Sequence, residues 1–389
     1  MERSKEMENL FRAVDERSCQ YEEFLQTICG IESKSDDKEG VDRVCAEILK
    51  AGRDLGFEER ILTHPKAGNV ASLTYNAEGK KPQVCLSAHM DTVFPRGTFG
   101  DPPVRREGDV LRGPGVMDCK GGIAVTLLVM DALSAVRYSS RPVKLILQSE
   151  EEIQCLLSSG KTLDFLREEA DGAAAFFNLE GREPGKITTR RKGILRAEMT
   201  VRGRAAHAGD YFEGASAVRA AAYKIISLET RSVRDGITYN CGIVSGGTAM
   251  NAIPAECRVW IDVRVSSRAE ADEAVEVMRA EAERTDVPGT SAEVRIISSR
   301  KPMERTEKNV MLFRHIDSVC RKYGFGEMRE NFSNGGSDAA YSTLMGIPTV
   351  DDLGIVGDNY HSLDEWCSLP SIAESAKIIA ASILELPDW

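Results

Sequence analysis

The sequence lacks an apolar segment of signal-peptide or membrane-spanning length after its charged N-terminus, Met1-Glu2-Arg3-Ser4-Lys5-Glu6. It also lacks an excess of basic residues, because 50 Lys and Arg stand against 61 Asp and Glu, for a formal charge of -11. Phosphate groups and anionic membranes attract clustered Lys and Arg. We therefore expect no nucleic-acid partner, no membrane partner and a cytoplasmic location, and we interpret the short basic run Arg190-Arg191-Lys192 as solvated.

A cysteine framework is missing as well. The ten cysteines form no Cys-x-x-Cys pair and show no spacing typical of a disulfide-rich domain. In a chain of 389 residues this pattern indicates reduced, mostly buried thiols. The hydrophobic fraction of 42% and the charged fraction of 29% are typical of a globular protein with two or three structural units.

Several common motifs of catalysis and nucleotide binding are incomplete or absent. The string from Gly113 to Asp118 resembles a dinucleotide fingerprint, but a carboxylate stands where its third glycine is needed. Ser159-Gly160-Lys161-Thr162 ends like a phosphate loop, but Cys155 occupies the place of the first glycine. There is no Gly-x-Ser-x-Gly and no His-Glu-x-x-His string. Nucleotide binding, serine-hydrolase chemistry and zincin chemistry therefore lose their usual support.

Strand and helix patterns alternate through the first half of the chain. Short apolar runs predict buried strands, and apolar residues at helical spacing predict helices between and before them. The predicted strands are 84–88, 143–147 and 173–177, and the predicted helices are 8–30, 39–54 and 121–136. This alternation predicts an α/β fold with a central, mostly parallel sheet flanked by helices.

The pattern changes near Gly193. The next elements are strand 194–201, helix 215–228, strands 237–244 and 257–265, helix 269–284 and strand 292–297. This βαββαβ order is typical of a ferredoxin-like α+β sandwich. Helices resume at 310–323 and 371–384. We therefore predict a discontinuous catalytic domain of residues 1–190 and 302–389, interrupted by an inserted domain of residues 191–301.

Acidic residues and histidines follow the predicted strands. His89 and Asp91 end the first strand, the triplet Glu150-Glu151-Glu152 ends the second, and Glu180 ends the third, while Asp118 precedes the helix between them. Ligands of open α/β sheets bind beyond the carboxyl ends of the strands, so these side chains should converge. An acidic triplet alone is most often a solvated helix start, but its place directly after a buried strand favours a site.

Converging carboxylates need a compensating charge. Packed together, they would repel one another and bind protons unless cations neutralise them. Imidazole and carboxylate ligands without thiolate suit Zn, Mn or Co, and enough of them are present for two ions bridged by one carboxylate. We expect two divalent metal ions, with zinc as the first choice. His64 and His315 are given no role.

Five strings occur in order, namely His89 to Val93, Gly113 to Gly122, the glutamate triplet, Glu180-Gly181 and His361-Ser362. Together they resemble the M20 family of co-catalytic zinc metallopeptidases and deacylases, over nearly the whole chain. The resemblance implies that Asp118 bridges both metals, with His89 and Glu180 on one ion and Glu152 and His361 on the other. It also implies that Asp91 orients His89 and that Glu151 is the general base.

The resemblance extends to the inserted domain. Gly203 to Gly209 looks like a lid motif whose histidine, His207, reaches the partner subunit's active site and stabilises the oxyanion, which implies a homodimer through this lid/dimerisation domain. Asn251 and Arg264 are similar to positions that hold the substrate's terminal carboxylate, although a strand arginine often pairs with a neighbouring acid instead. Gly336 lies in a further family motif at a helix start, where backbone amides hold an anion.

Further strings look like the glutamate carboxypeptidase branch of the family. They are Ala88 to Pro95, Ser337 to Tyr341, Leu353-Gly354 and the glutamate at position 180. Lys186 and Arg300 resemble positions that bind the acidic side chain of a C-terminal glutamate. Cys119 and Gln154 depart from the residues usual in the family, at positions to which the resemblance assigns no metal ligand.

Three functions follow from these observations. The first is a carboxypeptidase that releases a C-terminal, acidic amino acid from a peptide or N-acyl amino acid. The second is a deacylase of the N-acetylornithine or N-succinyl-diaminopimelate type, which uses the same chemistry with another pocket. The third is a dimeric binding protein that has lost activity, which predicts a missing ligand or base, and none is missing.

Overall fold

The computed structural model describes residues 2–389, with side chains from residue 5 onward. Two compact units make up the chain. The first comprises the residues up to Thr189 together with Arg305–Phe332 and Ser337–Trp389, and the second comprises Arg190–Glu304 and Ser333–Gly336. No helix within residues 2–389 is long and apolar enough to cross a membrane.

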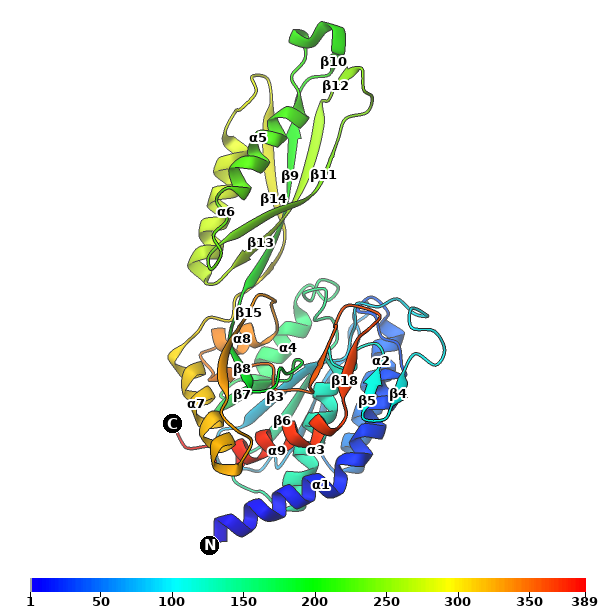
Figure 1. Cartoon of the computed structure of the whole chain (residues 1–389), viewed down its shortest axis with the longest axis vertical. Coiled ribbons are helices and arrows are strands. Elements are labelled where there is room, and N and C mark those ends of the chain that lie inside the picture. Colours follow the sequence, from blue (N-terminus) through cyan, green and yellow to red (C-terminus); the bar gives the residue numbers. More distant parts are fainter. Residues whose placement is uncertain (1) are drawn as a thin grey trace. The chain divides into compact units, whose positions relative to one another are not determined.

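A six-stranded sheet forms the centre of the first unit, with strand order β1-β2-β6-β3-β7-β16 (Figure 1). The strands are β1 (Glu58–Leu62), β2 (Val70–Tyr75), β3 (Val84–His89), β6 (Val143–Gln148), β7 (Ala175–Asn178) and β16 (Thr349–Val350). The last four in this order run parallel, and β1 and β2 are antiparallel additions at one edge. The predicted central, mostly parallel sheet is therefore confirmed.

Helices cover both faces of this sheet. One face shares an apolar core with α1 (Glu2–Cys29), α2 (Lys38–Asp54), α3 (Lys120–Ala135), α7 (Glu307–Tyr323) and α9 (Pro370–Leu384), and the other face packs on α4 (Lys161–Ala170) and α8 (Ala339–Leu344). Successive strand residues point to opposite faces, so Leu86 joins the first core and Cys85 the second. Burial on both sides explains why these strands are continuous apolar runs.

Two small sheets lie wholly or mostly in the first unit. The order β17-β18-β5-β4 joins Gly357–Asp358, Trp366–Ser368, Val110–Arg112 and Arg105–Glu107, and β8 (Lys186–Arg191) pairs with β15 (Arg329–Ser333). In the first of these sheets, Trp366 pairs with Arg112. This pairing holds the loop that contains His361 beside the loop that leads to Asp118.

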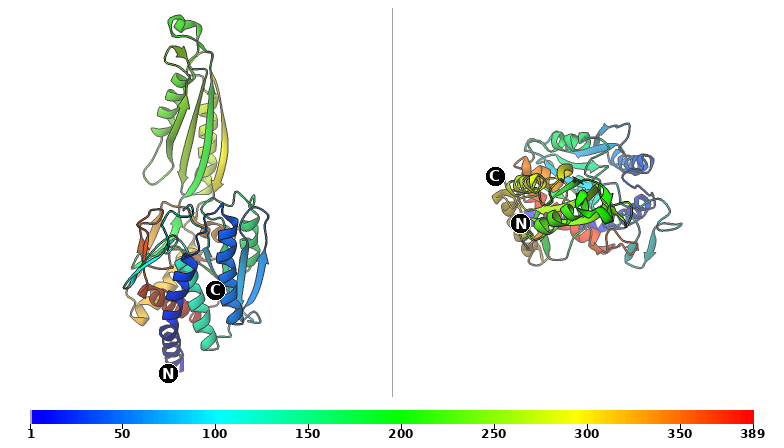
Figure 2. Two further views of the ribbon diagram at one scale, coloured as in Figure 1. Left: turned by 90° about the vertical axis from the view of Figure 1, so that its right-hand side faces the viewer. Right: turned by 90° about the horizontal axis from the view of Figure 1, so that it is seen from above.

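The second unit is a four-stranded antiparallel sheet of order β11-β13-β9-β14, with two helices on one face (Figure 2). Its elements are β9 (Gly193–Arg202), α5 (Ala217–Glu229), β11 (Thr238–Gly246), β13 (Glu256–Val265), α6 (Arg268–Glu283) and β14 (Ser291–Arg300). β10 (Ala206–His207) and β12 (Ala252–Ile253) pair as a short antiparallel ribbon. The 3-10 turn Ala208–Glu213 comes directly after β10. The four long strands and two helices follow the predicted βαββαβ order, whereas the short ribbon and the 3-10 turn were not predicted.

The two chain segments that bound the second unit are bonded to each other. The amide of Arg191 donates to the carbonyl of Met303 at 3.0 Å, and the amide of Met303 donates back at 3.1 Å. The basic run at this boundary is not solvated as expected, because Arg191 and Lys192 are buried. The ammonium group of Lys192 donates to the carbonyl of Gly236 at 3.0 Å, which satisfies the buried charge in part.

The ten cysteines all lie in the described part of the chain and are free thiols. Eight of them are buried, while Cys19 is exposed and Cys241 is partly so. The expectation of unpaired, mostly buried thiols is therefore confirmed.

Candidate metal centre

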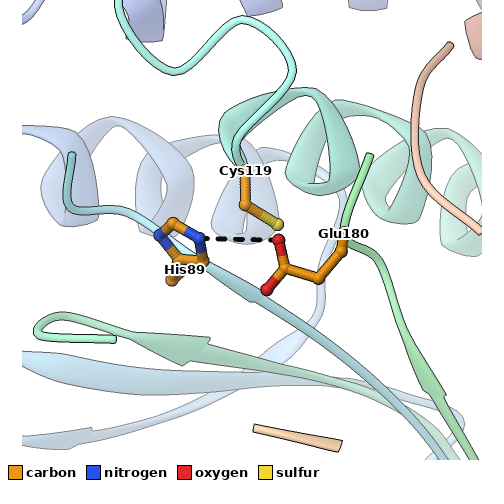
Figure 3. Close-up of side chains that lie close together, drawn as sticks. All are labelled: His89, Cys119 and Glu180. Carbon is orange, nitrogen blue, oxygen red and sulfur yellow. Dashed lines mark ion pairs between the residues drawn. The ribbon is translucent and has the colours of Figure 1, made fainter. Parts of the chain in front are cut away.

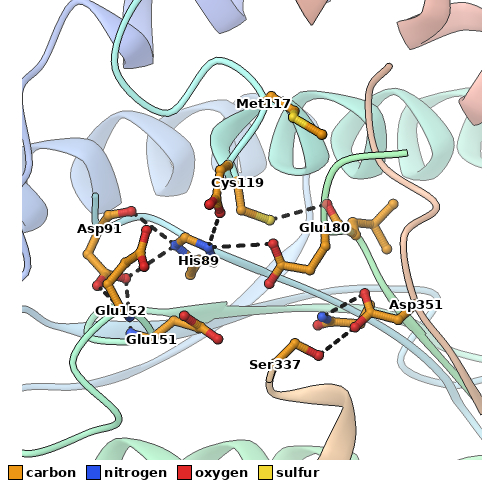
Figure 4. A network of polar contacts seen from close by, with 12 residues as sticks. His89, Asp91, Met117, Cys119, Glu151, Glu152, Glu180, Ser337 and Asp351 are labelled. Atoms are coloured by element: carbon orange, nitrogen blue, oxygen red, sulfur yellow. Dashed lines mark hydrogen bonds and ion pairs between the residues drawn. The ribbon is translucent and has the colours of Figure 1, made fainter. Parts of the chain in front are cut away.

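The carboxyl ends of three neighbouring parallel strands bring the predicted acidic residues and one histidine together. His89 is the last residue of β3, Glu151 and Glu152 follow β6, and Glu180 follows β7 (Figure 4). Asp118 enters the same region from the loop before α3, and His361 enters from the loop between β17 and β18. All six belong to the first unit.

Asp118 stands between the two histidines. Its Oδ1 lies 2.9 Å from Nε2 of His89, and its Oδ2 lies 3.2 Å from Nε2 of His361. Each histidine also has a second carboxylate nearby. Glu180 Oε2 lies 3.7 Å from Nε2 of His89, and Glu152 Oε2 lies 3.1 Å from Nε2 of His361. One carboxylate thus faces two imidazole–carboxylate pairs, an arrangement that suits two cations sharing a bridging ligand.

The raised pKa values of these groups agree with a place for a cation among them. Burial and the neighbouring Asp118 raise the pKa of Glu152 to about 7, and burial raises the pKa of Glu180 to about 8. Hydrogen bonds to Asp118 and Glu152 raise the pKa of His361 to about 10. Two overlapping groups of ligand atoms, His89 with Asp118 and Glu152, and His89 with Cys119 and Glu180, each lie within 4.8 Å of one another.

Asp91 supports this cluster from behind. Its carboxylate is 3.4 Å from Nδ1 of His89 and accepts hydrogen bonds from the backbone amides of Glu151 and Glu152 at 3.1 and 3.2 Å. The hydroxyl of Ser35 donates to it at 2.6 Å. The same His89 nitrogen also lies 3.0 Å from the carbonyl of Asp91. Asp91 therefore fixes both the imidazole ring and the start of the glutamate triplet.

The three glutamates of the triplet differ in their surroundings. Glu150 is fully buried and accepts from the amides of Leu157 and Ser158 and from the hydroxyl of Thr162 at 2.8 Å. It therefore fixes the following turn. Glu152 contacts His361, and Glu151 lies beside the cluster with a side chain that is almost completely buried.

Glu365 is a residue of the site that the sequence analysis missed. Its buried carboxylate accepts hydrogen bonds from the amides of Gly115, Met117 and Asp118 at 3.1, 2.9 and 3.1 Å. Burial, with the charge of Asp118, raises its pKa to about 7. The available signal was a glutamate four residues after His361, in a segment that returns to the strand β18. Glu365 orients the loop that presents the central carboxylate.

Cys119 also lies closer to the cluster than expected. It precedes α3, whose first turn contains Gly121 and Gly122. A Cβ atom on Gly122 would lie 2.1 Å from the carbonyl oxygen of Leu179, so only glycine permits this approach. The close approach brings Cys119 next to Glu180, and its Sγ donates to the Leu179 carbonyl at 3.2 Å.

The remaining predicted residues, apart from Lys186, lie in the second unit. His207 is exposed, and its Nδ1 accepts from the amide of Gly209 at 3.1 Å, while the neighbouring carbonyl of Asn251 accepts from the amide of Ala208. Arg264 pairs with Asp262 at 2.6 Å, as in the plain alternative for a strand arginine, and also donates to the carbonyl of Asn334. Their roles in substrate binding stay predictions.

Two of the predicted substrate residues lie in contact with each other. A Cβ atom on Gly336 would lie 2.6 Å from Cδ of Arg300, whose side chain is buried. Lys186, in the first unit, is exposed in part and pairs with Glu183 at 2.5 Å. Lys186 therefore has a local partner on the surface, which weakens its interpretation as a ligand for a substrate carboxylate.

We predict that Glu365→Gln weakens zinc binding about 10–100-fold, as is usual for groups that orient a ligand. The amide keeps one acceptor oxygen but loses the negative charge that holds three backbone amides. Zinc affinity would be measured by competition with a chelator. Asp364→Asn removes a charge from the exposed neighbour and should leave the affinity unchanged. Equal affinities in the two variants would contradict the orienting role of Glu365.

Comparison with known proteins agrees with this geometry. Residues 85–385 match the profile of peptidase family M20/M25/M40. Carboxypeptidase G2 from Pseudomonas sp. is 28% identical over 97% of this chain and 92% of its own length, and the succinyl-diaminopimelate desuccinylase of Wolinella succinogenes is 24% identical over 84% and 90%.

Solved structures share the fold at lower identity. The aminopeptidase PepT from Bacillus cereus superposes with a TM-score of 0.77 at 20% identity over 94% of this chain and 98% of that one. The M20 family metallo-carboxypeptidase Sso-CP2 from Sulfolobus solfataricus gives 0.73 at 16% identity over 92% and 97%. With its family profile matched over most of its length, the chain belongs to the M20 family of metal-dependent peptidases and amidohydrolases.

Proposed function

We propose that this protein is a two-metal hydrolase that cleaves the amide bond to a C-terminal amino acid. The observation that carries the proposal is the position of Asp118, whose two oxygens face His89 and His361 separately. His89 and Glu180 would hold one ion, and Glu152 and His361 the other. Zinc is the proposed metal, with manganese or cobalt as alternatives, because the donors are imidazole and carboxylate.

The proposed reaction assigns a separate task to each group. Divalent ions bound by these ligands would polarise the scissile carbonyl and lower the pKa of water. Glu151 accepts the proton of the attacking water and returns it to the leaving amine. The hydrogen bonds that Asp91 accepts from the amides of Glu151 and Glu152 hold the base beside the metal ligands. Burial of Glu151 keeps bulk water from competing for its proton.

The substrate class is supported by the relatives together with the arginines of the second unit. One relative is called a carboxypeptidase and another a desuccinylase, so both the peptidase and the N-acyl amino acid deacylase remain candidates. Arg264 and Asn251 are proposed to hold the terminal carboxylate, and Arg300 and Lys186 the acidic side chain. Gly336 is proposed to bind an anionic group of the substrate through backbone amides. Arg300 fits this role better than Lys186, which already pairs with Glu183.

A homodimer is part of the proposal. The edge strand β11 and the helix α5 of the second unit expose large apolar side chains, among them Ile243, Val244, Tyr223 and Ile226. An exposed edge with apolar side chains is a surface that a second copy can cover. A neutral His207 that accepts at Nδ1 carries its hydrogen on Nε2, where it can donate to an oxyanion in the partner subunit.

Replacing Glu151 with Gln should lower kcat by about 10²–10⁴-fold, the usual contribution of a general base. Metal content should stay at the level of the native protein, because Glu151 is not a proposed ligand. Glu152→Gln serves as the contrast and should lose metal together with activity. Steady-state kinetics and metal analysis of the same samples check this, and loss of metal in Glu151→Gln would overturn the assignment of the base.

A second experiment addresses the substrate. Dipeptides and N-acyl amino acids that differ only at the C-terminal residue are tested with Zn, Mn and Co, beside N-acetylornithine and N-succinyl-diaminopimelate. Converting the terminal carboxylate to an amide should lower kcat/KM about 30-fold or more, because losing one partner of a buried charge pair costs about 2–5 kcal/mol. A preference for the two biosynthetic substrates would favour the deacylase, and no turnover of any amide with metal bound would favour an inactive binding protein.

The role of His207 is tested by mixing two inactive variants. Glu151→Gln and His207→Ala subunits, differently tagged and purified as heterodimers, should recover up to about half of the activity of the native dimer, because one of the two sites then has both its own base and its partner's histidine. Each variant alone is the control. A purified heterodimer without activity would show that His207 does not act across the dimer.

A further inference from the structure

Cys119 brings a sulfur atom to the proposed metal ligands, in a cluster with His89 and Glu180 (Figure 3). The three ligand atoms lie within 4.8 Å of one another, His89 and Cys119 are buried, and the side chain of Glu180 is 12% exposed. Donor atoms that share one tetrahedral zinc ion lie roughly 3.3–3.8 Å apart, given the usual bond lengths. The 3.7 Å between His89 Nε2 and Glu180 Oε2 lies in this range, and the sulfur lies within 4.8 Å of both atoms.

The position of the sulfur follows from the backbone. Cys119 lies between Asp118 and the first turn of α3, and the glycines of that turn let it rest against the segment that carries Glu180. The hydrogen bond from Sγ to the carbonyl of Leu179, the residue before Glu180, holds the thiol at this place. Rotation of a flexible side chain is therefore not needed to bring the sulfur to the cluster.

The two halves of the site differ in the donors they offer. The half near His361 has an imidazole that is 48% exposed, together with Glu152. The half near His89 has an imidazole that is 2% exposed, together with Glu180 and the thiol. Sulfur donors favour zinc over manganese, whereas carboxylate and water do not. A buried sulfur donor near His89 would give that half of the site a preference for zinc over manganese that the half near His361 lacks.

We propose that Cys119 is a direct ligand of the metal in the buried half, beside His89 and Glu180, and makes that half selective for zinc. The inference rests on the proposed two-metal site. On binding, the S–H bond breaks, the proton leaves to solvent, and a sulfur–metal bond replaces the hydrogen bond to Leu179. The resemblance implies no metal ligand at position 119, so thiolate is an addition to the imidazole and carboxylate donors.

The test uses the full chain loaded with cobalt(II), because a thiolate bound to cobalt gives a near-ultraviolet charge-transfer band that oxygen and nitrogen ligands do not give. The band should appear with the first two equivalents of metal in the native protein and be absent from Cys119→Ser and Cys119→Ala. Cys85→Ala is the matched control, since this buried thiol of β3 points to the opposite face of the sheet and should leave the band unchanged.

Affinity provides a second measurement. Replacing a residue that only supports a metal ligand already lowers metal affinity about 10–100-fold. Loss of a direct sulfur ligand should therefore weaken zinc binding at least about ten-fold. Manganese binding should change less, so the ratio of zinc to manganese affinity should fall. Chelator competition on Cys119→Ser and Cys85→Ala gives both values.

The failures of the two proposals are distinguishable. Native protein that binds cobalt without a charge-transfer band, or a band that persists in Cys119→Ala, overturns the role of Cys119 and leaves the two-metal hydrolase intact. Native protein that binds no cobalt, zinc or manganese overturns the metal site itself. The native spectrum alone decides the first point, so the result does not depend on how well the variants fold.

Discussion

Carboxylates buried side by side repel one another, and in this protein Asp118, Glu152 and Glu180 converge on two histidines at the carboxyl end of a parallel sheet. The raised pKa values of Glu152 and Glu180 reflect first the cost of burying these charges and then their repulsion by Asp118. A cation removes that cost by allowing the carboxylates to ionise together. The sheet, the glycines at the start of α3 and the hairpin around His361 all serve to bring these groups closer than they would otherwise lie.

A second set of buried carboxylates has the opposite surroundings. Asp91, Glu150 and Glu365 each accept at least two hydrogen bonds from backbone amides. Such bonds replace the lost hydration of the carboxylate and tie a loop to a fixed point. The buried carboxylates around the site therefore divide into those that face one another and those that face backbone amides. The second set makes the geometry of the first set rigid, which is what a preorganised site requires.

Much of this could be predicted from the sequence. Strands buried on both faces are continuous apolar runs, and parallel strands deliver their following residues to one edge, so β3, β6 and β7 and the residues after them were found. The contacts of Glu365 were not found, because they join residues about 250 positions apart. Strands of two or three residues have too little periodicity to predict, and the burial of Arg191 and Lys192 depends on partners from distant segments.

The mutual hydrogen bonds of Arg191 and Met303 bring the two ends of the inserted unit to one point. An inserted unit whose two ends meet in this way requires only a short closure in the first unit, its host. The groups proposed to bind metal and move the proton all belong to the host. The inserted unit, with the proposed substrate contacts and the proposed dimer surface, can then change in evolution while the proposed metal ligands and the base are kept.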